Sequence, residues 1–254
     1  MESLNRRDLH EYIDENIIDF LCCRIEIMKK ITLYELLDKN FYLLRAKRST
    51  GQAYAMIQEM LDVYIVPVEE GLFGDFLKDL AIFVALRTTG GDKSCVPGID
   101  LEFFNKGIHY LVSIKSCINW GNSSQQHCLE EDFKKAVIGG QQSKFVVETK
   151  PVLGICYGKT RTEYMNGYLK VVGQNFWYFI SENIDLYTDI VELIGHRSQE
   201  HKREIDYPKE MGGIASRLTR QFFDEFCTPD LQIDWVKLVE FNSGNFDLDH
   251  FGKE

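Results

Sequence analysis

The stretch Pro97–Gln125, PGIDLEFFNKGIHYLVSIKSCINWGNSSQ, decides the fold of this chain. Its two apolar runs, Ile99–Phe104 and Tyr110–Lys115, flank the short polar connection Asn105–Gly107, which is typical of a hairpin turn. The sequence therefore predicts two antiparallel strands joined by a tight turn.

Charged side chains gather on one face of this predicted hairpin, because alternate residues of a strand point the same way. Asp100 and Glu102 share one face of the first strand, and Ser113 and Lys115 share one face of the second. Clustered carboxylates repel one another unless a cation is present. Mg²⁺ fits such a place, since it binds oxygen ligands, keeps several waters and takes phosphate oxygens. The alternative is a solvated hairpin face with an ordinary surface ion pair.

Three sequence segments resemble, in their order, type II restriction endonucleases of the PD-(D/E)XK superfamily. They are Pro97–Asp100 followed by Ser113–Lys115, then Lys115–Ser116 with Asn119–Gln125, and finally Gly173–Ser181 with Leu186–Tyr187. The resemblance covers roughly residues 66–195. It implies an α/β fold with a central mixed β-sheet flanked by helices. It also implies Mg²⁺-dependent, sequence-specific hydrolysis of double-stranded DNA that leaves 5′-phosphate ends.

The same resemblance gives roles to the hairpin residues. Asp100 would bind the metal, and Lys115 would orient the attacking water and offset charge on the phosphate. Ser113 stands where the family usually has Asp or Glu, and some similar members recruit a glutamate from the following helix. Candidates for the missing acid, which would also bind metal, are Glu131, Glu130 and Glu102, with Glu131 placed ahead of Glu130.

A helix predicted from Val68 to about Leu86 precedes the hairpin. In the family this helix lies across the sheet and can offer a carboxylate to the metal site, for which Glu70 and Asp75 are candidates. Glu70 has an alternative explanation, because an acidic residue in a first turn also stabilises a helix through its dipole.

Polar residues after the two central strands are candidates for DNA contacts. Amide and hydroxyl groups bond phosphate oxygens and base edges, and a loop after a buried strand, here Val152–Tyr157, is a usual place for function. Ser123 or Ser124 also suits the N-cap of a helix over Cys128–Val137. The candidates are Asn119, Asn122, Ser123, Ser124, Gln125, Lys159 and Arg161.

Length and helical periodicity predict the domain organisation. The chain has 254 residues, of which 44% are hydrophobic and 27% charged, as in ordinary globular proteins. Residues 1–66 are predicted to be a helical lobe for dimerisation or for contact along DNA, closed by Pro67, and residues 67–254 the nuclease core. A homodimer suits palindromic DNA, because its two-fold symmetry matches that of the site.

Charge and cysteine content bear on the partner and the compartment. The net charge of −10 counts modestly against DNA, although binding depends on a local positive lining. No apolar run approaches the ~18 residues of a membrane span, and seven scattered cysteines suit the reducing cytoplasm. Two alternatives stay open: another nuclease of this fold, such as a junction resolvase or repair nickase, or a non-catalytic DNA-binding protein with a decayed site.

Overall fold

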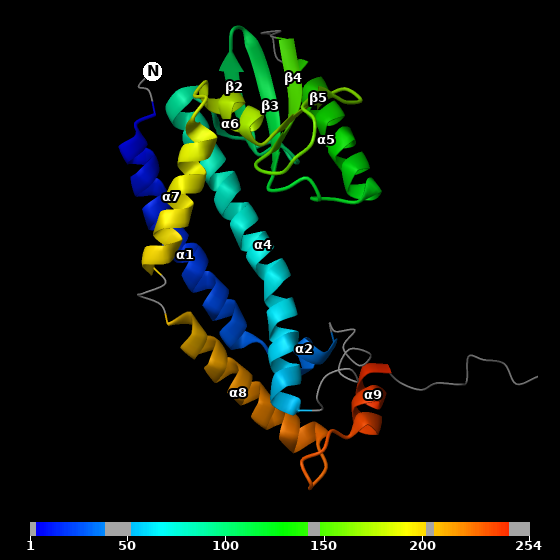
Figure 1. The fold of residues 1–254 in the computed structure, drawn as a ribbon. Helices are drawn as coiled ribbons and strands as arrows, with labels where there is room; N and C mark the ends of the chain where they lie inside the picture. Colours follow the sequence, from blue (N-terminus) through cyan, green and yellow to red (C-terminus); the bar gives the residue numbers. More distant parts are fainter. Residues whose placement is uncertain (1–3, 39–51, 142–147, 202–205, 244–254) are drawn as a thin grey trace, which may run out of the picture. The chain divides into compact units, whose positions relative to one another are not determined.

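The computed structural model describes residues 4–38, 52–141, 148–201 and 206–243 (Figure 1). The helices are α1 (Arg6–Lys30), α2 (Leu33–Asp38), α4 (Ala53–Thr88), α5 (Ser123–Gln141), α6 (Gln174–Ser181), α7 (Leu186–His201), α8 (Tyr207–Phe226) and α9 (Trp235–Ser243). The strands are β1 (Asp92–Lys93), β2 (Leu101–Asn105), β3 (Ile108–Lys115), β4 (Glu148–Ile155), β5 (Glu163–Tyr164) and β6 (Leu169–Val172). The chain forms two compact units, Met1–Phe20 with Gly71–Arg203 (unit 1) and Leu21–Glu70 with Glu204–Glu254 (unit 2).

Unit 1 is built on a mixed sheet whose strands, in the described part of the chain, follow the order β1-β2-β3-β4-β6-β5. Strands β3, β4 and β6 run parallel, while β1, β2 and β5 pair antiparallel with their neighbours. The predicted α/β fold, a central mixed sheet flanked by helices together with an N-terminal helical region, is confirmed. The buried strand predicted over Val152–Tyr157 is β4, in the middle of the sheet.

The predicted hairpin is β2 and β3. Its two-residue turn, Lys106-Gly107, has φ angles of 50° and 78°, the left-handed pair that a tight hairpin requires. The register pairs Leu101 with Val112 and Glu102 with Leu111. The alternation of faces predicted from the sequence therefore holds on both strands.

Helices cover both faces of the sheet. On one face, apolar residues of α1, α4, α6 and α7 pack against Leu101, Phe103, Val112, Ile114 and Val152. On the other, Leu129, Phe133 and Ala136 of α5 pack against Leu111, Leu153 and Ile155 (Figure 1). Trp177 of α6 is buried and its indole N–H donates to the Cys156 carbonyl at 2.9 Å, so it is a core residue.

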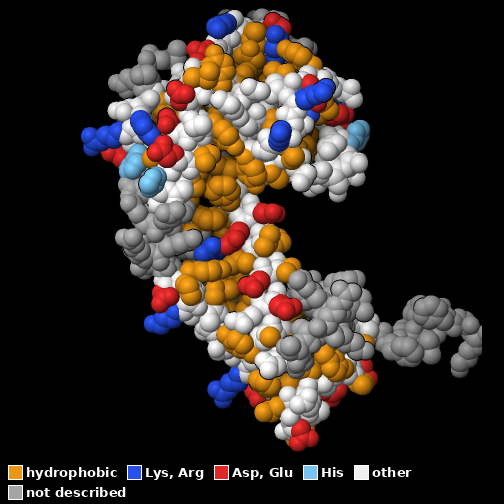
Figure 2. Space-filling model, in the orientation of Figure 1, with side chains coloured by type: hydrophobic (Ala, Val, Ile, Leu, Met, Phe, Trp, Pro, Cys, Tyr) orange, Lys and Arg blue, Asp and Glu red, His pale blue; other side chains and the backbone are white. Residues whose placement is uncertain are grey.

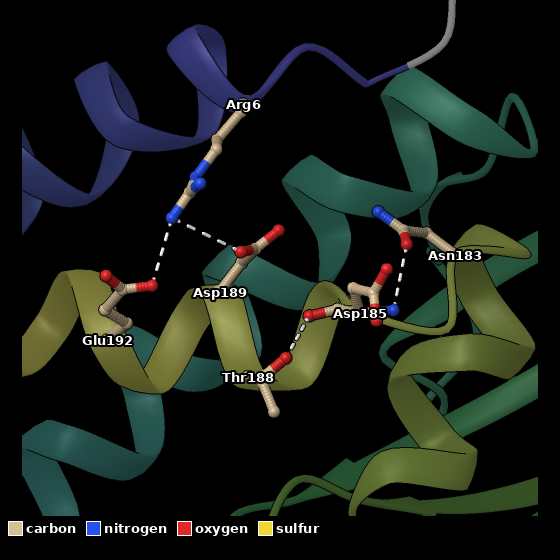
Figure 3. Close-up of polar contacts among 6 residues, drawn as sticks. All are labelled: Arg6, Asn183, Asp185, Thr188, Asp189 and Glu192. Carbon is tan, nitrogen blue, oxygen red and sulfur yellow. Dashed lines mark hydrogen bonds and ion pairs between the residues drawn. The ribbon is translucent and has the colours of Figure 1, made fainter.

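The start of α1 is tied to α7 by charged side chains within unit 1. The Arg6 guanidinium lies 3.0 Å from Glu192 and 3.5 Å from Asp189, both on α7 (Figure 3). At the N-terminus of α7, the Asp185 N–H donates to the Asn183 side chain, and the Thr188 hydroxyl donates to the Asp185 carbonyl. The first of these bonds satisfies a backbone N–H that the helix terminus leaves without an intrahelical partner, whereas the Asp185 carbonyl also accepts from the Asp189 N–H at 3.0 Å.

Unit 2 has its own core. Apolar side chains of α2, α8 and α9 pack there with those of residues 21–30 of α1 and 53–70 of α4. The Arg217 guanidinium of α8 donates to the carbonyls of Lys29 and Ile31 at 3.2 and 2.8 Å, where α1 ends. Among the described residues, no helix combines the length and the hydropathy that a membrane crossing needs.

The helix boundaries differ from the prediction at Pro67. Helix α4 continues through this proline to Thr88, so Pro67 does not close the first helical block. A proline removes one helical hydrogen bond, to the carbonyl four residues earlier. Val63 and Pro67 are both exposed, and the carbonyl that loses its partner therefore lies on the solvent side of the helix. The compact units accordingly do not follow the predicted division into 1–66 and 67–254, because α1 and α4 each contribute to both.

Candidate active site

Asp100 is fixed at the start of β2. One carboxylate oxygen, Oδ2, accepts a 2.6 Å hydrogen bond from the Ile114 N–H and lies 3.5 Å from the Ser113 hydroxyl. The other oxygen, Oδ1, lies 3.2 Å from the Lys78 ammonium of α4. Ser113 is fully buried, so its hydroxyl takes part in holding Asp100 rather than facing solvent. Asp100 itself stays 20% exposed.

Lys115 ends β3 beside Asp100. Burial lowers the pKa of the Lys115 ammonium, Asp100 and Asp132 act in the opposite direction, and Lys78 adds to the lowering. The ammonium lies 5.3 Å from the centre of the Trp120 ring, which limits its contact with water. A half-buried cation beside a carboxylate is suited to meet a further negative group.

The lowered pKa of Lys115 predicts a pH-dependent difference in stability between the wild type and Lys115→Met. Below the pKa that Lys115 has in the folded protein, its buried charge lowers the free energy of unfolding. This destabilisation vanishes as the pH rises to 10.5, the ordinary pKa of a lysine. We expect the variant to be more stable at pH 7, by about 1 kcal/mol or less because solvent screens a partly exposed ammonium. Urea unfolding from pH 7 to pH 10.5 measures this advantage, which should shrink with pH. A wild type that is the more stable at pH 7 would contradict the prediction.

Asp132 of α5 is a carboxylate that sequence reasoning missed. Its side chain packs over Gly98, where an added Cβ would lie 2.6 Å from Oδ2 and 2.7 Å from the Asp132 Cβ. The charge of Asp132 also raises the pKa of the Lys115 ammonium. Asp132 therefore lies beside the turn that leads into Asp100 and close to Lys115.

Helix geometry explains why Asp132, rather than its neighbours, faces this edge of the sheet. At 3.6 residues per turn, Asp132 lies about 60° from the centre of the buried stripe formed by Leu129, Phe133 and Ala136. Glu130 lies about 90° away on the opposite side and Glu131 about 170° away. This wheel can be drawn from the sequence, and it is the signal that was available for Asp132.

The two glutamates proposed from the sequence point elsewhere. Glu131 pairs with His127 at 3.4 Å and with Lys135 at 4.0 Å, and is half exposed. Glu130 lies on the side of α5 that faces Tyr168, whose pKa is raised by burial and then by Glu130. Among the described residues, neither glutamate forms a hydrogen bond or ion pair with Asp100 or Lys115.

Glu102 is likewise held by other partners than Asp100, and Glu70 belongs to a different compact unit from Asp100. The carboxylate of Glu102 accepts from the Ser94 hydroxyl and lies 3.0 Å from the His109 ring nitrogen. Glu70 is exposed and belongs to unit 2, whereas Asp100 belongs to unit 1. The described residues contain no group of three or more His, Cys, Asp or Glu side chains placed to hold a metal ion. Any divalent ion here would therefore complete its shell with water or substrate oxygens.

The loops that hold the predicted DNA contacts follow β3 and β4. The Cys156 and Tyr157 N–H groups donate to the carbonyls of Lys115 and Ser116 at 2.9 Å, which extends the pairing of these strands. Ile118 packs directly on Gly158, so the two loops touch. The candidates on this rim are all exposed: Asn119, Asn122, Ser123, Ser124, Gln125, Lys159 and Arg161.

Two of these candidates have a local role that differs from the prediction. Helix α5 begins at Ser123, and Asn122 rather than Ser123 or Ser124 caps it. The Asn122 side chain accepts from the Gln125 N–H at 3.0 Å, while the Gln125 side chain accepts from the Asn122 N–H at 2.9 Å. This reciprocal arrangement is a capping box that satisfies two backbone donors. The serines lie in the first turn of the helix.

Charge on the visible surface of unit 1 is mixed. On the face drawn in Figure 2, Lys and Arg side chains are interspersed with Asp and Glu rather than gathered in one basic patch. This agrees with the net charge of −10. A DNA contact on this face would therefore rest on individual cations and polar loop groups.

The contact between Gly98 and Asp132 predicts a large effect of Gly98→Ala, with Gly107→Ala as a matched control. Both glycines have left-handed φ angles, 82° and 78°, but an added Cβ meets Asp132 at Gly98 and nothing within 4 Å at Gly107. We expect about 1–2 kcal/mol of lost unfolding free energy for Gly107→Ala and about 2–4 kcal/mol for Gly98→Ala. Urea unfolding measures both values. Equal losses would mean that Asp132 is not held against this turn.

A family model described as type II restriction endonuclease EcoO109I matches residues 7–202 of the chain. The match includes Asp100, Lys115 and Asp132 and extends through most of α7. No curated protein is significantly similar to the sequence.

Proposed function

Because the chain belongs to the family of type II restriction endonucleases that EcoO109I represents, we propose that it cuts double-stranded DNA at specific sequences by Mg²⁺-dependent hydrolysis. The observation that supports the proposal is that Asp100 and Asp132 both raise the pKa of the half-buried Lys115 by their charge, while Asp132 packs on Gly98, two residues before Asp100. We also propose that the chain is a PD-(D/E)XK enzyme in which Ser113 has replaced the usual acid.

The side chains at this edge fit a Mg²⁺ ion. Asp100 Oδ1 is the carboxylate oxygen left without a backbone donor, and Asp132 offers a second carboxylate near the same lysine. Mg²⁺ is usually held by one or two carboxylates together with water and substrate phosphate oxygens. When bound, the ion would supply Lewis-acid stabilisation of the phosphate and acidify the attacking water.

The chain's own residues contribute binding and orientation. The Ile114 N–H and the Ser113 hydroxyl hold the Asp100 carboxylate in one direction. The Lys115 ammonium, half-buried and stacked near Trp120, is pre-positioned for the negative charge that develops on the phosphate oxygens. We propose that Lys159, Arg161 and the polar groups of Asn119–Gln125 contact the DNA backbone and bases. Cleavage would leave 5′-phosphate ends.

Assembly and compartment complete the proposal. A two-fold homodimer would match a palindromic site. We propose that residues 1–66 serve for dimerisation or as an arm along DNA. All seven cysteines are free thiols, which suits the reducing cytoplasm as the place of action.

Digestion of a long phage DNA with Mg²⁺, followed by gel electrophoresis and sequencing of the ends, tests this function. We expect discrete fragments with 5′-phosphate ends, and none when EDTA removes the metal. A smear would contradict sequence specificity. Intact DNA at every Mg²⁺ concentration would contradict the proposal as a whole and would favour a non-catalytic DNA-binding protein.

A further inference from the structure

Lys78 of α4 forms an ion pair with Asp100 that contributes little to the stability of the fold. Its ammonium is 3.2 Å from Asp100 Oδ1, and the two side chains are 35% and 20% exposed. Ion pairs that water reaches contribute little to folding, typically ~0–1 kcal/mol. The neighbouring residues of α4, Leu77 and Leu80, are buried, so the lysine emerges at the edge of the apolar stripe.

A second cation at this carboxylate opposes the first. Lys115 directly follows Ile114, whose N–H donates to the Asp100 carboxylate, so a second lysine is carried on the strand that holds Asp100. Asp100 and Asp132 together offset these two lysines, so a divalent cation that binds Asp100 must compete with the Lys78 ammonium for Oδ1. When Asp100 binds a metal ion, a DNA phosphate is a negative group with which the displaced Lys78 ammonium can pair.

The two oxygens of Asp100 are used differently. Oδ2 is held by the Ile114 N–H at 2.6 Å, within the sheet. Oδ1 faces Lys78, which is carried on a long flexible side chain from a different element. The backbone donor is fixed, whereas the ammonium can leave by rotating its side chain.

We propose that Lys78 is a displaceable counter-ion, which occupies Asp100 Oδ1 in the metal-free protein and must give it up to a divalent cation. This inference rests on the proposed function and adds a residue to it. Lys78 is thus a positioning residue that keeps Asp100 in place before metal and DNA bind. Released from Asp100, its ammonium is free to pair with a DNA phosphate.

Titration of DNA-free protein with Mn²⁺, followed by the EPR signal of the free ion, tests the inference. We expect Lys78→Met to bind Mn²⁺ about 3- to 10-fold more tightly than the wild type, because the competing cation is gone. Lys78→Arg should stay near the wild type. The matched control is Lys134→Met, which removes the same charge from an exposed position of α5 and should change the affinity less than twofold.

The outcomes separate this inference from the proposed function. Unchanged or weaker Mn²⁺ binding by Lys78→Met would overturn the counter-ion role while leaving the nuclease proposal in place. Equal Mn²⁺ affinities of the wild type and Asp100→Asn would instead contradict the metal site itself, and with it the proposed function. Thermal unfolding checks that each variant is folded, and Lys78→Gln serves as a second neutral variant if Lys78→Met is not.

Discussion

Asp100→Asn and Lys115→Met are expected to reduce the single-turnover rate of DNA cleavage by about 10³-fold or more. Asp100 is the carboxylate fixed by the Ile114 N–H, and its amide replacement keeps the shape but loses the charge that would hold Mg²⁺. Lys115 supplies the half-buried ammonium beside it. The rates should be measured with enzyme in excess over a duplex that contains the mapped site.

Binding and folding controls separate a loss of catalysis from a loss of DNA affinity or of folding. DNA affinity measured in Ca²⁺ should change little for Lys115→Met, because most of the DNA contacts proposed here come from other loops. Lys134→Met, which removes an exposed lysine of α5, should retain cleavage. Variants that lose activity only because they unfold would make Asp100 and Lys115 structural residues, and variants that cut at wild-type rates would refute the site.

Asp132→Asn is expected to reduce cleavage by about 10²-fold or more, as the loss of a metal carboxylate would. Asp132 lies against Gly98 and its charge raises the pKa of Lys115, so we assign it as the acid that α5 contributes to the site. Glu131→Gln and Glu130→Gln are isosteric controls on the same helix. Both should keep rates within about threefold of the wild type, since their side chains face His127 and Tyr168 instead.

Parallel measurement of Glu102→Gln completes this comparison. The Glu102 carboxylate is held by Ser94 and His109, so we expect Glu102→Gln to lower the free energy of unfolding and to leave the rate of cleavage little changed. The reverse pattern would contradict our assignment: a rate lost in Glu102→Gln or Glu131→Gln and kept in Asp132→Asn would move the second metal carboxylate to that residue.

Local alternation was enough to predict the hairpin and the side of it that carries charge. The face shared by Asp100, Ser113 and Lys115 follows from a period of two residues and from one tight turn at Lys106-Gly107. The central position of β4 likewise follows from an unbroken apolar run. These are properties that neighbouring residues determine among themselves.

Tertiary placement was harder to predict. Choosing Asp132 over Glu131 required the rotation of α5 about its axis relative to the sheet, which Leu129 and Phe133 fix by burial. The sequence did not predict Lys78 as a site residue, because its ion pair with Asp100 joins residues 22 positions apart and no local pattern indicates it. The uninterrupted course of α4 through Pro67 depends on solvent reaching one side of the helix.

Cleavage of the polypeptide by bound Fe²⁺ measures most directly whether these groups share one metal. Fe²⁺ in place of Mg²⁺, with ascorbate and peroxide, cuts the backbone close to the ion, and mass spectrometry locates the cuts. We predict cuts near Asp100, Lys115 and Asp132 that excess Mg²⁺ suppresses and that Asp100→Asn removes. Cuts confined to other segments, or unchanged in Asp100→Asn, would contradict a metal-dependent nuclease site at this edge of the sheet.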